Sequence, residues 1–264
     1  MCLVILALDQ HPDLPFVLAG NRDEFHARPT LAAHRWLDRP GIIGGRDTEK
    51  GGTWLGVATR GALATVTNYR DPSRRRPDAR SRGLLVSDFL GDPDRSTAMQ
   101  YVESRVAEGD RHDGFNLIAA DAYGVWYGSN RGGLRRLRAG IHALSNHLLD
   151  TPWPKAERLR ESAIAALCAP AATCIDSLFL ALTDRRPVAD ADLPSTGVPI
   201  DWERRLSTAF IASPDYGTRS SSVVTMDRGG VLRLEERTFD PSGIETGRAV
   251  IETRLENPID APPG

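Results

Sequence analysis

Cys2 combines the two chemical groups that a self-sufficient nucleophile needs. The small residue after Met1 favours removal of Met1, which would leave Cys2 with a free α-amine beside its thiol. An α-amine has a pKa of about 8, so it can act as a general base at neutral pH. A thiolate is a strong nucleophile, and one residue would then supply both functions. The alternative is a small buried cysteine on a first strand, which is a common structural feature.

Four polar residues, Asn21-Arg22-Asp23-Glu24, follow the apolar run Phe16–Gly20. We expect them to end this second strand, at its open end. If residues 2–8 and 16–20 pair as a hairpin, Cys2 lies near the same end. Arginine can bind an anion through two hydrogen bonds or lower the pKa of a thiol, and a carboxylate can orient an amine. The simpler interpretation is a solvated junction between a strand and a loop.

Polar residues also end several other apolar runs. Asparagine amides are natural donors to an oxyanion, so their recurrence at strand ends predicts a single cleft, although each one alone is better explained by structure. The six histidines show no spacing typical of metal ligands, and no metal site is expected. The further candidates for catalysis or binding are Asn68, Arg70, Asn116, Asn146, His147, Arg219 and Trp54.

The segment Arg70–Arg82 is unusually basic and contains Pro72 and Pro77. This composition is typical of an exposed loop. The same segment could act as a lid, or as a rim that attracts anions.

The elements that must position these residues follow from apolar periodicity and from glycine and proline. A helical pattern over 84–108 breaks near Gly91-Asp92-Pro93, and two helices follow at 155–167 and 173–182. A surface loop is expected over 186–199. Strands are predicted at 2–8, 16–20, 41–45, 53–59, 62–68, 115–119, 124–127, 140–145, 220–227, 231–239 and 250–254.

Strands and helices come in blocks rather than in strict alternation, which argues against a doubly wound parallel sheet. We expect an α+β protein in which two mainly antiparallel sheets pack together with helices outside. Residues 1–256 would form a single domain. Residues 257–264, with three prolines, would be a loose tail.

Composition excludes several classes of function. The chain has 264 residues and a formal net charge of −2, which does not suggest nucleic-acid binding. No apolar run approaches the length of about 18 residues that a membrane span needs. Three cysteines do not make a disulfide scaffold, and a cytoplasmic location is expected. The oligomeric state does not follow from the sequence.

Several segments together resemble the NRDE family, also called the transport and Golgi organisation protein 2 family. They run from residue 1 to about residue 225 of the chain, and their combination is far more specific than any one of them. The matching segments are Met1-Cys2, residues 19–25 with Arg28-Pro29, residues 44–47, residues 51–56, residues 67–70, Ser145-Asn146 and residues 216–220.

The resemblance implies an N-terminal-nucleophile hydrolase-like fold, which is a four-layer αββα sandwich. Enzymes of that wider fold cleave amide bonds with an N-terminal cysteine, serine or threonine. By that similarity Cys2 is the nucleophile and base, and Arg22 and Asp23 orient it. Asn68 and Asn146 stabilise the oxyanion. The spacing within Asn21–Glu24 differs from the amidase pattern, so the division of roles there stays open.

Three functions are compatible with these observations. The first is a cysteine hydrolase that cleaves an amide or thioester of a small molecule through an acyl-enzyme on Cys2. The second is a binding or trafficking protein that uses the same cleft for haem or an acyl-CoA, with His147 and His26 as the histidines to test. The third, ranked last, is a structural or trafficking factor without a small ligand. The enzyme reading requires no cofactor.

Overall fold

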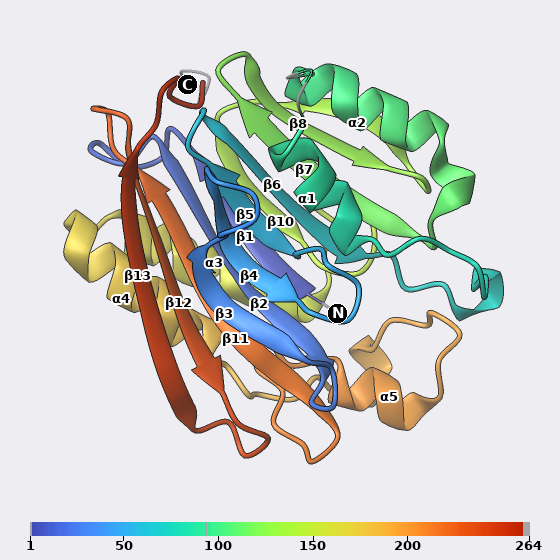
Figure 1. Cartoon of the computed structure of the whole chain (residues 1–264). Helices are drawn as coiled ribbons and strands as arrows, with labels where there is room; N and C mark the ends of the chain where they lie inside the picture. Colours follow the sequence, from blue (N-terminus) through green and yellow to red (C-terminus); the bar gives the residue numbers. More distant parts are fainter. Residues whose placement is uncertain (1, 93, 95, 261–264) are drawn as a thin grey trace.

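The computed structural model describes residues 2–92, 94 and 96–260, which form two antiparallel sheets stacked between two pairs of helices (Figure 1). The first sheet has six strands in the order β10-β1-β2-β11-β12-β13. The second has seven, in the order β3-β4-β5-β6-β7-β8-β9. The strands of the first sheet are β1 (Cys2–Leu8), β2 (Phe16–Phe25), β10 (Gly140–Leu144), β11 (Tyr216–Met226), β12 (Val231–Phe239) and β13 (Glu245–Arg254). Those of the second are β3 (Thr30–Arg35), β4 (Ile42–Asp47), β5 (Leu55–Ala58), β6 (Ala62–Asn68), β7 (Phe115–Asp121), β8 (Gly124–Ser129) and β9 (Gly133–Leu137).

Helices cover the outer face of each sheet. α1 (Gly83–Leu90) and α2 (Ala98–Ala107) pack on the second sheet, and α3 (Pro154–Leu167) and α4 (Ala171–Leu182) pack on the first. The short helix α5 (Ile200–Arg205) lies apart from these layers, near the end of β2 (Figure 1). Three 3-10 turns occur at η1 (Pro72–Arg74), η2 (Gly109–Arg111) and η3 (Asp190–Asp192). The architecture is the predicted α+β sandwich with four layers, αββα.

Alternation along β1 explains why this strand is apolar on both faces. Val4 and Leu6 belong to the core between the two sheets, whereas Leu3 and Ile5 belong to the core beneath α3 and α4. A strand that is covered on both sides has no solvent face, so its sequence reads as a continuous apolar run. Because side chains alternate between the two faces of a strand, Cys2 lies on the same face as Val4 and Leu6, which faces the second sheet.

Most predicted elements are confirmed, and the break in the 84–108 helix falls between α1 and α2; Pro93 itself lies outside the described residues. Three elements were not predicted: β3, β9 and α5. β3 and β9 are the two edges of the second sheet, and β9 is mostly exposed. Edge strands with little buried surface carry only a weak apolar pattern, which is why the sequence did not indicate them.

Asn21–Glu24 end the second strand as expected, but the alternative of a solvated junction between a strand and a loop is wrong. β2 continues to Phe25, because β11 pairs with it along its whole length and supplies backbone partners beyond Gly20. Asn21, Arg22 and Asp23 are therefore buried strand residues rather than a solvated junction.

Part of the expected tail is described. The side chain of Ile259 is buried in the core between the sheets, and the backbone N–H of Asp260 donates to the carbonyl of Asp121 over 3.0 Å. Residues 261–264 lie outside the described residues. Among the helices that the structure describes, none is long and apolar enough to cross a membrane.

Candidate active site

Four side chains form a row across neighbouring strands of the first sheet. Arg22 on β2 lies opposite Cys2 on β1 and also opposite Ser220 on β11, and Ser220 lies opposite Thr238 on β12. Residues directly opposite each other in antiparallel strands project on the same face. All four line one pocket of about 760 Å³, which opens between the two sheets.

The second sheet and a long loop supply the remaining walls of this pocket. β4 contributes Gly45, β6 contributes Asn68, and the segment just before β5 contributes Thr53 and Trp54. The loop between β6 and α1 contributes residues 76–77 and 79–82, and α1 begins at the pocket with Gly83. The pocket thus joins strand-end residues from both sheets, as the recurrence of polar strand ends predicted.

Cys2 and Arg22 are both 7% exposed at the pocket floor. Burial raises the pKa of the Cys2 thiol, and the neighbouring Arg22 guanidinium acts in the opposite direction. Arg22 makes no ion pair with any described residue, and its Nη1 atom is buried without a hydrogen-bond partner among them. A buried charge of this kind is costly unless something compensates it.

Asp23 lies next to this row on β2. Its Oδ1 accepts a hydrogen bond of 2.8 Å from Thr218 Oγ1, and its backbone carbonyl accepts one of 3.2 Å from the Tyr216 hydroxyl. Burial raises the pKa of the Asp23 carboxyl, and the nearby ammonium of Lys155 opposes that shift. The carboxylate is therefore rigidly placed beside the start of β1, where it can orient an amine.

Lys155 on α3 is a residue that the sequence analysis missed. Its ammonium is buried and donates to the carbonyl of Leu206 over 2.8 Å. Burial lowers the pKa of Lys155 to about 8, while the negative charge of Asp23 acts against this. A lysine on the inner face of an otherwise apolar helix stripe is the signal that could have revealed it.

Glu236 on β12 was also missed. Its carboxylate is buried at the pocket, where Oε1 accepts from the Ala33 backbone over 2.6 Å and Oε2 from Ser222 Oγ over 3.2 Å. Burial raises the pKa of the Glu236 carboxyl. Alternation predicts this position: Leu232 and Leu234 face the core between the sheets, so Glu236 faces inward too.

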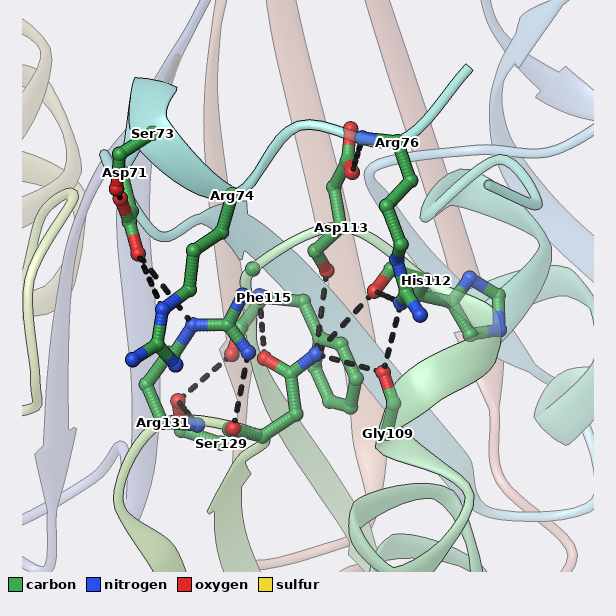
Figure 2. A network of polar contacts seen from close by, with 12 residues as sticks. Asp71, Ser73, Arg74, Arg76, Gly109, His112, Asp113, Phe115, Ser129 and Arg131 are labelled. Carbon is green, nitrogen blue, oxygen red and sulfur yellow. Dashed lines mark hydrogen bonds and ion pairs between the residues drawn. The ribbon is translucent and has the colours of Figure 1, made fainter. Parts of the chain in front are cut away.

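The basic loop that covers the pocket is tied to the 109–114 turn. The Arg76 backbone N–H donates to Asp113 Oδ1 over 2.9 Å, and the Arg76 guanidinium reaches the His112 carbonyl over 2.5 Å. Figure 2 shows these contacts, with Arg74 and Arg131 both directed at Asp71 on the other side of the network. The loop is exposed, as expected, but anchored at both flanks.

Seven of the predicted residues line the pocket and five do not. The lining contains Cys2, Arg22, Asp23, Glu24, Trp54, Asn68 and Arg219. The side-chain amide of Asn68 makes no hydrogen bond with the described residues, so it is available to a ligand. Arg219 donates from Nη1 to the carbonyls of Phe25, His26 and Arg28, each at 3.0–3.1 Å.

Asn21 points to the opposite face of the sheet. Its amide donates to the carbonyls of Leu182 and Ala209, each over 2.8 Å, and its Oδ1 accepts from Ser221 Oγ over 2.6 Å. All of these partners lie on the α4 side of the sheet or on β11. Asn21 therefore fastens the helical layer to β2 rather than facing the pocket.

Arg70 and Asn146 form a buried tie beside the pocket. Arg70 Nη1 lies 2.5 Å from Glu203 Oε2 of α5, and both side chains are almost fully buried. Asn146 donates from Nδ2 to the Asn68 carbonyl over 3.1 Å and receives the Arg70 backbone N–H at its own carbonyl over 2.7 Å. Asn146 thus fixes the backbone of Asn68 and does not itself reach the pocket.

Asn116 and His147 also belong to the framework. Asn116 donates to the His147 carbonyl over 2.9 Å and accepts from the Tyr127 hydroxyl over 2.9 Å. The His147 ring lies 5.0 Å from that of Tyr69, and its Nδ1 is 2.9 Å from Thr151 Oγ1. These contacts hold the turn after β10 against β6 and β7.

Comparison with known proteins gives the family. The model of the Transport and Golgi organisation 2 family matches residues 1–241. A Bos taurus homolog of Transport and Golgi organization protein 2 is 37% identical and covers 93% of this chain and 97% of its own. The Homo sapiens homolog is 35% identical, and the match covers 90% of this chain and 93% of the human chain. The Drosophila melanogaster protein is 26% identical, and the match covers 98% of this chain and 100% of the fly chain.

Among solved structures, a Caenorhabditis elegans N-acylethanolamine-hydrolyzing acid amidase ortholog is similar with a TM-score of 0.45 and 12% identity, over 84% of this chain and 92% of that chain. The family match and the relatives agree along nearly the whole chain. The chain belongs to the Transport and Golgi organisation 2 family.

Proposed function

We propose that this protein is a cysteine hydrolase that cleaves an amide or thioester bond of a small molecule through an acyl-enzyme on Cys2. One observation carries the proposal: the only thiol in the described pocket lining stands beside Arg22 and Asp23 at the pocket floor. A four-layer sandwich with a cysteine at the start of its first strand also supports the N-terminal-nucleophile hydrolase-like classification.

The chemistry proceeds in two steps once Met1, which lies outside the described residues, has been removed. The Cys2 sulfur attacks the substrate carbonyl carbon, and the thiol proton passes through the Cys2 amine to the leaving nitrogen or sulfur. The C–N or C–S bond breaks and a thioester to Cys2 forms. Water then attacks that thioester, which releases the acid and restores the thiol.

The surrounding residues take distinct parts in the proposal. Arg22 favours the thiolate through its positive charge, and Asp23 orients the amine. Asn68 donates its free amide to the oxyanion. Asn146 acts indirectly, because its hydrogen bond holds the Asn68 backbone in place. Asn68 is thus the oxyanion donor in the pocket, and Asn146 is the positioning residue behind it.

Intact mass and thiol labelling test the proposal. Protein isolated from its native host should lack Met1, and an electrophilic thiol probe should label Cys2 much faster than the exposed Cys168. The variant Cys2→Ala should lose the fast phase and retain the slow one. Retention of Met1, or equal labelling of the wild type and the variant, would exclude the hydrolase mechanism.

The basic character of the pocket supports a second candidate, in which the cleft binds haem or an acyl-CoA without turnover. Arginines in the lining suit the carboxylates of haem or the phosphates of CoA. No histidine is among the described lining residues, so a haem iron in this pocket would take the Cys2 thiolate as its protein ligand. Titration with haem distinguishes the two: a Soret shift that Cys2→Ala abolishes supports the binding function.

The cellular setting remains part of the proposal. A free thiol nucleophile and two further free cysteines suit the reducing cytoplasm. The printed names of the relatives, which refer to transport and Golgi organisation, are compatible with a trafficking role, which ranks below both functions of the pocket.

A further inference from the structure

The pocket around Cys2 has an excess of positive charge. Its lining contains seven arginines and one lysine against five carboxylates, so the excess must be resolved by pairing outside the pocket or by a ligand. Four of the lining arginines form ion pairs within the protein. These pairs are Arg28 with Asp47 and Arg46 with Asp38, each over 2.6 Å, Arg80 with Asp88 over 3.5 Å, and Arg76 with Asp110 over 3.8 Å.

Arg22 and Arg82 are not neutralised in this way. Neither forms an ion pair with a described residue, and Arg82 donates only to the carbonyl of Gly114, over 3.2 Å. Only 7% of the surface of Arg22 is exposed, and its Nη1 atom has no hydrogen-bond partner among the described residues. Buried polar groups are nearly always hydrogen-bonded, so an unpartnered guanidinium at a pocket indicates that a ligand supplies the acceptor.

Arg82 lines the same pocket as Arg22 and comes from the loop between β6 and α1. It precedes α1, whose N-terminal residues Gly83 and Leu84 also line the pocket and carry the positive end of the helix dipole. Burial lowers the pKa of Arg82, while the charges of Asp113, Glu24 and Cys2 act against that shift. Arg82 and Cys2 therefore line one pocket, where the charges of both groups act on a bound ligand.

The loop that carries Arg82 is held in position. The Arg80 backbone N–H donates to the Arg111 carbonyl over 2.9 Å, and His112 Nδ1 lies 3.0 Å from the Arg80 carbonyl. The neighbouring contacts of Arg76 with Asp113 and His112 appear in Figure 2. A guanidinium on an anchored loop loses less freedom on binding a ligand than one on an unrestrained loop.

We propose that Arg82, together with Arg22, selects substrates that carry a carboxylate or phosphate close to the bond that Cys2 attacks. That the bound anion belongs to a substrate of Cys2 rests on the proposed hydrolase function. The anion-binding site itself does not depend on turnover. Guanidinium groups bind both kinds of anion through paired hydrogen bonds, so the two sources share one chemistry.

Two alkylating agents that differ in charge test the selection directly. Iodoacetate and iodoacetamide both transfer a two-carbon group to a thiolate, with formation of a C–S bond and loss of iodide. The ratio of their rates at Cys2, divided by the same ratio at the exposed Cys168, isolates the effect of the pocket. We expect this normalised ratio to favour iodoacetate by about tenfold, the effect of one charge-assisted contact.

Three variants complete this test. Arg82→Gln should bring the normalised ratio close to one, whereas Arg82→Lys should retain a preference for iodoacetate. Arg75→Gln removes an exposed arginine of the same loop that does not line the pocket, and it should leave the ratio unchanged. A wild-type ratio near one, or equal ratios in the wild type and Arg82→Gln, would overturn the proposal.

Protection experiments identify the anion. Pyrophosphate and succinate are each added during labelling with iodoacetamide, with sodium chloride at matched ionic strength as control. Protection of Cys2 by pyrophosphate assigns a phosphate, protection by succinate assigns a carboxylate, and protection by neither beyond chloride contradicts the site. If the wild-type protein prefers iodoacetate but hydrolyses no ester, the anion-binding site stands and only the proposed hydrolase function is overturned.

Discussion

Two clusters of charged residues in this protein differ in how their central charge is paired. At the turn after β10, Asp150 accepts hydrogen bonds from Arg135, Arg160 and the Ala143 backbone at 2.8–3.0 Å. At the pocket floor, Arg22 is more deeply buried but has no ion pair with a described residue. The first cluster satisfies its central charge within the chain, and the second leaves its central charge to be satisfied from outside.

The difference separates stability from function. A carboxylate with several donors stabilises the fold, and its removal leaves those donors unsatisfied. A buried unpaired guanidinium destabilises the fold, so its presence indicates a task in binding or catalysis. Substitutions in the two clusters should therefore have opposite effects on activity and on stability.

Replacement of the nucleophile should have the largest effect on activity. Cys2→Ala is expected to lower the hydrolysis rate of an activated ester by at least about 1000-fold, because the acyl-enzyme cannot form. Stopped-flow or absorbance kinetics with p-nitrophenyl acetate measures this. Cys168→Ala is the matched control and should keep the wild-type rate; an equal loss in both variants would remove Cys2 from its catalytic role.

Arg22→Gln should separate activity from stability. We expect kcat/KM to fall by about 100-fold, the usual effect of removing one electrostatic contact in an active site. The free energy of unfolding should stay the same or rise, because an unpaired buried charge disappears. Urea denaturation and ester kinetics on the same variant provide both values. A loss of stability with unchanged kcat/KM would invert the assignment.

Asp150→Asn should show the reverse. The substitution is expected to lower the free energy of unfolding by about 1–2 kcal/mol, since Arg135 and Arg160 lose a charged acceptor that is partly exposed. The hydrolysis rate should change less than about twofold if the folded state is unaltered. The midpoint of urea denaturation measures the first effect, and a midpoint equal to that of the wild type would contradict it.

The smallest expected effect is a change with pH in the stability difference between the wild type and Asp150→Asn. Burial alone would raise the pKa of Asp150, but hydrogen bonds from His142, the Ala143 backbone and two arginines hold it well below its ordinary range. A depressed carboxyl pKa contributes stability above the ordinary value of about 4 and loses it as the pH falls through the folded-state pKa. The stability gap between wild type and Asp150→Asn should therefore narrow below about pH 4.

The fold was largely predictable because buried strands and amphipathic helices have strong periodic patterns. Residues 62–68, 2–8 and 231–239 were predicted with the bounds that the structure has. The extension of β2 to Phe25 was not, because it depends on pairing with β11, which is distant in the sequence. Local polarity suggested a loop, and tertiary pairing prevailed.

The site was predictable only in part. The strand-end pattern singled out Cys2, Arg22, Asp23 and Asn68, and the structure places all four in the lining of one pocket. This pattern could not separate Asn68 from Asn146. Asn68 ends β6 and Asn146 follows β10, and only the hydrogen bonds show which amide is free. Lys155 comes from a helix behind the sheet, so its approach to Asp23 depends on packing that no local pattern encodes.

In the proposed mechanism Cys2 carries the acyl group during turnover. Rapid mixing with p-nitrophenyl acetate, acid quenching and mass spectrometry of the peptides test it most directly. We expect a protein that begins at Cys2 and carries one acetyl group on the Cys2 peptide, which disappears as hydrolysis proceeds. Retained Met1, or an acetyl group found only on Cys168 or on lysines, would contradict it.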